Sequence, residues 1–300
     1  MLEKIKEVPF IDESAAVKLT SVEGKLVLER YDKVIWAREE TKLEVDTSIN
    51  CYVEAEKFFV LFPNIKALEQ GTCLTVTLKN GAVYELPFLD VSWETQEMPE
   101  EFNNTITFAL DDLMLCTLKN LIKPELQCIY IDKEGAVSCN FISACISTAV
   151  KADEGFLLPP DVQALVNGRV CKVNVGEDKL YFRASDFSII TSKPVHEEED
   201  WWESLRGMIS EADKFTKATP LVDGMKRLGM FSDYVSFDGE KVISGENFEP
   251  FKFKNIEDRK YEIERLNRIL TTAEEITEDN ENLVFKNSNC KFLVSPMEDA

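Results

Sequence analysis

Histidine is almost missing from this sequence, since His196 is the only one among 300 residues. A Ser-His-Asp or Cys-His nucleophilic site needs a histidine with suitable partners, and a multi-histidine metal centre needs several. His196 instead lies beside the acidic stretch 197–200, and the phosphate-binding patterns G-x-x-x-x-G-K-[ST] and G-x-G-x-x-G do not occur. We therefore expect no enzyme, no metal and no cofactor. A metal-dependent nuclease built from carboxylates stays open, because the 55 acidic residues place carboxylates throughout the chain.

Paired cysteines are also missing. The eight cysteines are scattered, mostly in apolar stretches, and form no C-x-x-C pair. This spacing argues against a zinc site or a disulfide framework and for free thiols in a reducing compartment. The N-terminus has no signal-peptide pattern, and no run approaches the ~18 apolar residues that cross a bilayer. We expect a soluble cytoplasmic protein with no membrane partner.

Positive charge is scarce, because 34 Lys and Arg face 55 Asp and Glu and give a formal net charge of -21. DNA-binding domains usually carry a basic excess. However, the acidic residues cluster in segments such as 94–101, 197–200 and 274–281, whereas several expected helices carry mainly basic polar residues. Two interpretations stay open: a solvated acidic surface that maintains solubility, or an acidic exterior combined with one locally basic face.

What the sequence does contain is a pattern that occurs three times at a spacing of roughly 105 residues, too long for solenoid or propeller units. Each copy predicts a short strand, a short helix and then further alternating strands. The copies lie at 51–86, 155–182 and 259–285, and the third is the loosest. A spacing as long as a small domain predicts repeated modules.

Two breaks divide the chain. Residues 94–104 are polar and include Pro99, and 196–200 are acidic and follow Pro194. They predict modules at 1–102, 103–198 and 199–300. The first should be shortened at its start, because only Met1–Ala16 precede its first strand pair. Trp201 and Trp202 follow the second break and either pack as a hinge between modules or join a partner-binding surface.

Three segments carry a resemblance to a known family. Residues 155–193 combine Phe-Leu-Leu-Pro, a short helix and the closing strand Asp-Phe-Ser-Ile-Ile-Thr-Ser-Lys. Residues 291–297 end in Val-Ser-Pro-Met, and 19–87 have the matching order of strands and helix. The chain resembles the bacterial sliding clamp, the DNA polymerase III beta subunit, in a divergent, phage-type form. Ser295 departs from the family's closing apolar-Met-Pro-Met pattern.

The resemblance implies an α+β protein with the DNA clamp fold, in which outer antiparallel β-sheets and inner helices form a ring. It implies a polymerase processivity factor that encircles duplex DNA without sequence preference and tethers a DNA polymerase and other partners. Further implied partners are a clamp loader and a second copy of the chain in a head-to-tail homodimer. The setting would be the cytoplasm of a bacterial cell or a phage-infected host. The alternative is a clamp-like acidic protein that binds or inhibits replication proteins without encircling DNA.

The resemblance also implies basic residues that face the DNA. Taken singly, each also fits an ordinary solvated charge. The candidates, in chain order, are Lys57, Lys66, Lys119, Lys123, Arg169, Lys214, Lys217, Lys226, Arg227, Arg265 and Arg268.

A second implied site is an apolar pocket near the junction of the middle and last modules, where partners insert a short peptide. Ser143, Ala144 and Cys145 stand where the family has glycine, histidine and arginine, which puts the shape of the pocket in doubt. Some of the candidates also fit ordinary core positions. The pocket residues are Phe141, Ile142, Ile146, Leu205, Leu293, Ser295 and Met297.

Overall fold

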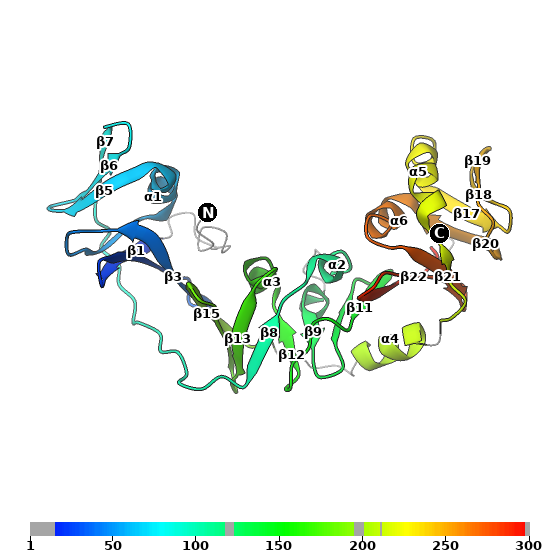
Figure 1. Ribbon diagram of the computed structural model, residues 1–300, viewed down its shortest axis with the longest axis horizontal. Helices are drawn as coiled ribbons and strands as arrows, with labels where there is room; N and C mark the ends of the chain where they lie inside the picture. The colour runs from blue at the N-terminus through cyan, green and yellow to red at the C-terminus, as the bar shows by residue number, and fades with distance from the viewer. Residues whose placement is uncertain (1–15, 118–122, 195–200, 211, 298–300) are drawn as a thin grey trace. The chain divides into compact units, whose positions relative to one another are not determined.

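The computed structural model describes residues 16–117, 123–194, 201–210 and 212–297 (Figure 1). The chain forms two compact units: unit 1 comprises residues 1–108 and 161–193, and unit 2 comprises 109–160 and 194–300. Each unit combines an antiparallel eight-stranded sheet with a smaller antiparallel sheet and short helices. No helix in the described part of the chain is long and apolar enough to span a membrane.

The large sheet of unit 1 joins an N-terminal group of strands to strands from the middle of the chain. Its order is β4-β1-β2-β3-β15-β14-β13-β8. Alternation along β1 buries Val17 and Leu19, as expected of a strand with one face on the core. The strands are β1 (Ala16–Val22), β2 (Lys25–Tyr31), β3 (Ile35–Glu44), β4 (Asn50–Glu54), β8 (Asn104–Thr107), β13 (Val170–Val175), β14 (Lys179–Arg183) and β15 (Phe187–Ser192).

Short helices and a small sheet complete unit 1. Helix α1 (Ala55–Leu61) buries Phe58 and Phe59, and the 3-10 helix η2 (Phe62–Asn64) follows it. Helix α3 (Pro160–Val166) begins at the boundary of the unit and buries one side of its surface. The small sheet has the order β5-β6-β7 and consists of β5 (Ile65–Gln70), β6 (Leu74–Leu78) and β7 (Val83–Leu86).

The large sheet of unit 2 is built in the same way from two distant parts of the chain, with the order β12-β9-β10-β11-β23-β22-β21-β16. Strands β11 and β23 form the join. The strands are β9 (Ile129–Ile131), β10 (Ala136–Cys139), β11 (Ser143–Ser147), β12 (Phe156–Leu158), β16 (Thr216–Lys217), β21 (Glu275–Asp279), β22 (Asn282–Lys286) and β23 (Cys290–Val294).

The remaining elements of unit 2 are helices and a four-stranded sheet with the order β19-β18-β17-β20. Its strands are β17 (Tyr234–Asp238), β18 (Lys241–Ser244), β19 (Asn247–Pro250) and β20 (Asn255–Glu262). The helices are α2 (Asp111–Met114), the 3-10 helix η3 (Pro124–Gln127), α4 (Trp201–Ser210), α5 (Thr219–Leu228) and α6 (Ile263–Ile269).

The strand-helix-strand pattern is present at all three predicted places: β4-α1-β5, β12-α3-β13 and β20-α6-β21. The apolar spacing from Leu113 to Ile122 predicts a helix that ends before Pro124, and this was wrong in length, because α2 ends at Met114 in the described residues. The helix-like stretch that the sequence predicts from Trp201 to Met230, interrupted near Pro220, consists of two helices, α4 and α5, with β16 between them.

The division into modules 1–102, 103–198 and 199–300 stays a prediction. Each large sheet joins strands from two of those segments. The shortened start of the first module, and His196, fall on residues outside the described ranges.

Candidate functional site

The join between β11 and β23 creates an apolar row on one face of the unit 2 sheet. Ala144 on β11 pairs with Leu293 on β23, and Leu293 pairs with Val284 on β22. The next position on the same face pairs Ile146 with Lys291. Because successive side chains of a strand point to opposite faces, these residues share one side of the sheet. We call this surface the seam.

Helix α4 packs against the seam and contacts β11 and β23. In Figure 1, α4 is drawn below β11, and α2 is drawn above β11 on the other side of the sheet. Ile209 of α4 and Ala212 just after it are buried against Ala144, Val284 and Leu293. Partly buried apolar side chains extend this contact, and they are Cys139, Ile146, Leu205 and Phe215. The helix thus places the Leu205 and Ile209 side chains, one turn apart, on an aliphatic strip.

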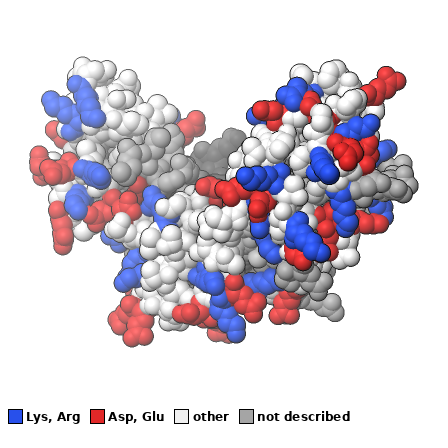
Figure 2. Space-filling view, turned by 45° about the vertical axis from the view of Figure 1, so that its right-hand side comes forward, with Lys and Arg blue, Asp and Glu red and all other residues white. Residues whose placement is uncertain are grey.

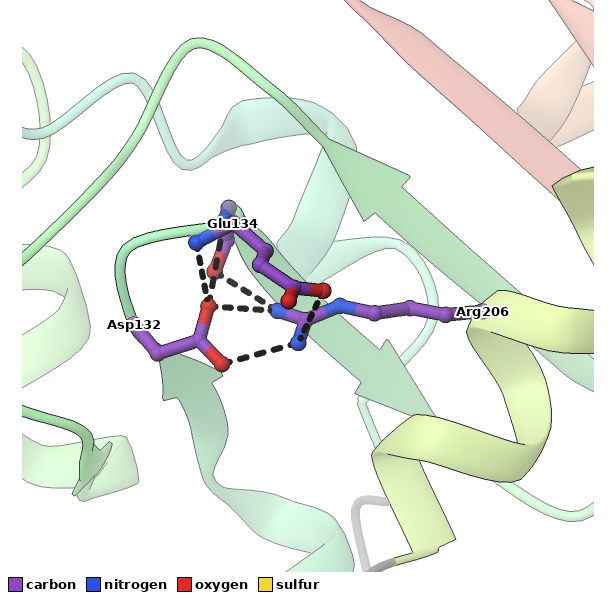
Figure 3. Close-up of polar contacts among 4 residues, drawn as sticks. Asp132, Glu134 and Arg206 are labelled. Atoms are coloured by element: carbon purple, nitrogen blue, oxygen red, sulfur yellow. Dashed lines mark hydrogen bonds and ion pairs between the residues drawn. The ribbon is translucent and has the colours of Figure 1, made fainter.

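A polar anchor holds the middle of α4 to the β9–β10 turn (Figure 3). The Arg206 guanidinium donates to both carboxylate oxygens of Asp132, at 2.7 and 2.8 Å, and to the Gly135 carbonyl at 3.1 Å. A weaker contact of 3.4 Å reaches Glu134. Gly135 has a φ of +147°, and a Cβ there would lie 2.3 Å from the Ser147 carbonyl oxygen. A side chain at this position would therefore distort the turn that Arg206 grips.

The charges of this anchor stabilise each other. Burial acts to raise the pKa of Asp132, but the hydrogen bonds from Arg206 and from the Glu134 and Gly135 amides outweigh it and hold the pKa below its usual range. Burial opposes the charge of Arg206 as well, yet the hydrogen bond and charge of Asp132 raise its pKa. Both groups are therefore charged at neutral pH.

Aromatic and cationic contacts secure the two ends of α4. Near its start, the Trp202 ring stacks on Tyr130 of β9 with centroids 3.8 Å apart, and Trp202 is only 6% exposed. At its end, the Lys291 ammonium donates to the Ile209 carbonyl at 3.3 Å, a favourable place for a cation because carbonyls carry the negative end of the helix dipole. Lys286 lies 4.2 Å above the Phe215 ring. Trp202 is thus a packing residue that joins the last part of the chain to β9.

The structure brings several predicted pocket residues to this seam. Ile146, Leu205 and Leu293 all belong to the apolar cluster. The Ser295 amide donates to the Ile142 carbonyl at 2.9 Å, which extends the ladder of β11 and β23 by one bond. The role of these residues in binding a partner stays a prediction.

Two other predicted pocket residues lie beyond the end of the seam. Phe141 is 55% exposed in the β10–β11 turn, with Lys123 5.9 Å from its ring. Met297 bonds through its amide to the Lys260 carbonyl of β20. Neither belongs to the cluster under α4.

The sequence did not predict that α4 itself covers the seam. The spacing of Trp202, Leu205 and Ile209 places them on one side of a helix and was the available signal. Arg206 and its partner turn carried no local signal, because the two segments are distant in sequence and meet only through the sheet.

The predicted DNA-facing residues lie on several kinds of element. Lys57 lies on α1, Lys226 and Arg227 on α5, and Arg265 and Arg268 on α6. The resemblance implies helices on the inner side of the ring and hence DNA-facing residues on helices, and this was wrong for Lys66, which is on β5, and Lys217, which is on β16. Lys123, Arg169 and Lys214 lie outside α-helices, in connections, and Lys119 falls outside the described residues.

Several of these cations have acidic neighbours. Lys57 lies 2.5 Å from Glu54, and Arg227 makes two bonds to Glu249, at 2.6 and 2.9 Å. Arg169 lies 3.1 Å from Asp186. Figure 2 shows the same mixing, with basic and acidic side chains next to each other over much of the visible face. The carboxylates beside Lys57, Arg169 and Arg227 thus offset part of the positive charge at these three positions.

Two arginines of α6 line a small polar cavity of about 80 Å³. Arg265 donates to Glu262 and to the Asn140 side chain, both at 2.9 Å, and Arg268 approaches the Leu115 carbonyl at 3.5 Å. Ser143 also lines this cavity. Because Ser143 and Ala144 are successive residues of β11, the cavity opens on the face of the sheet opposite α4.

No protein-family model and no curated protein matches the sequence. Solved structures do match over nearly the whole chain. The DNA polymerase III subunit beta of Borrelia burgdorferi, solved with a natural product, is 14% identical with a TM-score of 0.76, and the match covers 99% of this chain and 96% of that one. The subunit of Pseudomonas aeruginosa is 13% identical with a TM-score of 0.74, covering 97% and 94%. The Helicobacter pylori beta clamp bound to a DNA ligase peptide is 13% identical with a TM-score of 0.73, covering 99% and 96%.

These matches confirm the predicted α+β fold class. The chain has the fold of the beta clamps, with antiparallel sheets and few, short helices.

Proposed function

We propose that this protein is a DNA sliding clamp, a non-catalytic ring that encircles duplex DNA and tethers a polymerase and other partners. The observation that carries the proposal is the extent of the fold match, which covers 97–99% of this chain and 93–97% of the clamp chains. Because the match includes nearly all residues of both chains, it favours a shared role of the whole molecule. A match limited to one domain would not.

A ring needs little affinity for the DNA that it encloses. Topology retains it, so weak phosphate contacts without base readout let it slide. The ion-paired arginines and lysines described above fit this requirement, because exposed charges each contribute about 1 kcal/mol or less. The net charge of -21 would keep DNA off the outer surface.

Ring closure is proposed to occur head to tail between two copies of the chain. In unit 1, the edge strand β7 presents Tyr84, which is 46% exposed. In unit 2, the turn after α5 presents Met230, 73% exposed, and Phe231, and the edge strand β19 presents Phe248. Exposed apolar residues at sheet edges are unusual in a monomer, since edges invite pairing with another chain.

The experiment that tests the role uses the full chain, a nicked circular plasmid and a bacterial clamp loader with ATP. Native mass spectrometry should give a dimer. Protein loaded on the circle should survive gel filtration in high salt, and cutting the plasmid once should release it. A strictly monomeric protein, or one that leaves circular and linear DNA equally fast, would refute the proposal.

The second candidate function is a clamp-like acidic protein that binds or inhibits replication proteins without encircling DNA. The pairing of Lys57, Arg169 and Arg227 with carboxylates favours it, because paired cations attract phosphates less. The retention measurement of the same experiment separates the two roles, because this candidate predicts no retention on circular DNA. A primer-extension assay with added polymerase gives a second readout, in which this candidate predicts a reduced, not an increased, processivity.

A further inference from the structure

Under α4, the seam is a strip suited to a short aliphatic peptide. Its floor consists of Ala144, Ile146, Val284 and Leu293, all aliphatic. The α4 side chains that fill it, Leu205 and Ile209, are four residues apart and lie on one face of the helix. Any segment that presents two aliphatic side chains at this spacing would make the same contacts.

Two lysines lie at the end of the strip. Lys286 and Lys291 are paired across β22 and β23, and Lys286 also forms an ion pair of 2.6 Å with Glu275. Both ammonium groups lie against the Phe215 ring, and Lys291 also binds the last turn of α4. When α4 leaves, Lys291 loses its bond to the Ile209 carbonyl, and a peptide with acidic residues after its aliphatic anchors would place a carboxylate beside this lysine.

Helix α4 is a weak helix in its own right. It has ten residues, and isolated helices shorter than about 12–15 residues are marginal in water. Gly207 stands in its interior, where glycine favours the helix less than alanine does. A Cβ at Gly207 would meet no atom within 4 Å, so packing does not require a glycine there. The helix therefore depends on its docking contacts.

The strongest of those contacts lie away from the aliphatic strip. Arg206 grips the Asp132 turn between β9 and β10, and Trp202 stacks on Tyr130. The strip itself lies on β11, β22 and β23. The anchor can thus be released without altering the surface that α4 covers.

We propose that α4 is a built-in competitor: it occupies the seam in cis, and a partner peptide with two aliphatic anchors followed by acidic residues binds there only by displacing it. This inference rests on the proposed clamp function for its biological purpose, but its physical content is independent of DNA. Access to the seam is then set by the Arg206 anchor and by the helix propensity of α4.

The test uses the full chain and a fluorescein-labelled peptide that copies residues 201–217, whose binding is followed by fluorescence anisotropy. Arg206→Ala should bind the peptide at least about tenfold more tightly than the unchanged chain, because the loss of a charged, hydrogen-bonded anchor is worth more than 1.4 kcal/mol. Gly207→Ala should weaken binding about threefold to fivefold, because alanine strengthens the competitor. A peptide carrying Leu205→Ala and Ile209→Ala should not bind.

A charge swap separates release of α4 from damage to the fold. Arg206→Asp alone should open the seam, and adding Asp132→Arg should restore the anchor and reduce peptide binding again. The peptide used in this arm carries Arg206→Ala, so that it does not itself meet the changed residue 132. Equal peptide affinity in the unchanged chain and in Arg206→Ala would overturn the proposal, as would a failure of Arg206→Ala to bind. If Arg206→Ala does not fold, an unchanged affinity in Gly207→Ala overturns it.

The assay contains neither DNA nor polymerase. A chain that fails to encircle DNA can still show the displacement, and a true clamp can fail to show it. The displacement of α4 and the proposed clamp function are therefore tested independently of each other.

Discussion

Ala144 on β11 stands directly opposite Leu293 on β23, and through this pair the middle of the chain and its last strand share one ladder. Both side chains are buried beneath α4. The pairing is one of the contacts that join residues 109–160 and 194–300 in one compact unit. It also sets the floor of the proposed partner site, so stability and binding depend on the same contact.

Leu293→Ala should therefore destabilise unit 2 by about 2–4 kcal/mol, the usual cost of a cavity at a leucine site that cannot collapse. Leu293 is 4% exposed. The matched change Leu205→Ala, at a half-buried position on α4, should cost no more than about 1–2 kcal/mol. Urea denaturation followed by fluorescence measures both. Equal losses in the free energy of unfolding would mean that the α4 side chain contributes as much to the core as the β23 side chain.

Arg206→Ala should lower the free energy of unfolding by about 1–3 kcal/mol, because it removes a two-bond contact and leaves the partly buried Asp132 with fewer partners. Lys133→Ala is the matched control, since Lys133 is an exposed cation of the same turn. Its effect should stay within about 0.5 kcal/mol. A similar loss in both variants would show that the turn, and not the ion pair, is responsible.

The Arg206 contact should also depend on acid. The pKa of Asp132 is lowered in the folded protein, so its stabilisation is complete above the ordinary aspartate value of about 3.9 and is lost as the pH falls through the lower, folded value. The difference in unfolding free energy between the unchanged chain and Arg206→Ala should shrink below about pH 4. In the Asp132→Asn background the difference should no longer change with pH there. A difference that grows in acid would contradict the assigned contact.

The elements that sequence could predict are those encoded by local patterns. Cys171, Val173 and Val175 alternate with less buried residues and mark β13. Two prolines and Asp161 mark the start of α3. In β13 and α3 the local preference for strand or helix agrees with the tertiary structure, so the sequence pattern was enough to predict them.

Where the sequence misled, a distant contact or a side chain competed with the local pattern. The interruption expected near Pro220 in the helix-like stretch 201–230 begins earlier, because Thr216 and Lys217 pair with Ile276 and Glu275 of β21. Helix α2 ends early, and the Thr117 hydroxyl donates to the Met114 carbonyl beside that end. The spacing of apolar residues along the sequence gives no information about such contacts.

The candidate site was predictable only in part for the same reason. The apolar residues Ile146 and Leu293 could be placed in strands through the resemblance of their segments to the family's strands. Their pairing across the sheet, and the Arg206 anchor that places α4 over them, connect segments that share no local pattern. The residues that pair with Ile146, Leu293 and Arg206 could be identified only from the folded structure.

The proposed dimer makes a prediction by complementation. Tyr84→Glu and Phe231→Glu should each reduce the native mass from dimer to monomer, because each places a charge in both copies of the proposed interface. Val60→Glu, at an exposed apolar position on α1, should leave the dimer intact.

Mixing Tyr84→Glu with Phe231→Glu should restore a dimer held by one unaltered interface. In a head-to-tail arrangement, one of the two junctions then contains both altered residues and the other contains neither. Native mass spectrometry of the mixture measures this. Failure to recover any dimer would argue against a head-to-tail contact between these two edges.

The location of the basic residues decides which of them meet DNA. If helices line the hole, the pair Lys57→Gln with Lys226→Gln should weaken association with a nicked plasmid, and the slope of log affinity against log salt should fall by about 1 for each lysine removed. The pair Lys66→Gln with Lys217→Gln removes the same charge from strands β5 and β16 and should have little effect. Retention of loaded rings on circular DNA should not change in either variant, because topology, not charge, holds them. A strand-borne pair that weakens association as much as the helix-borne pair would mean that DNA does not run along the helices.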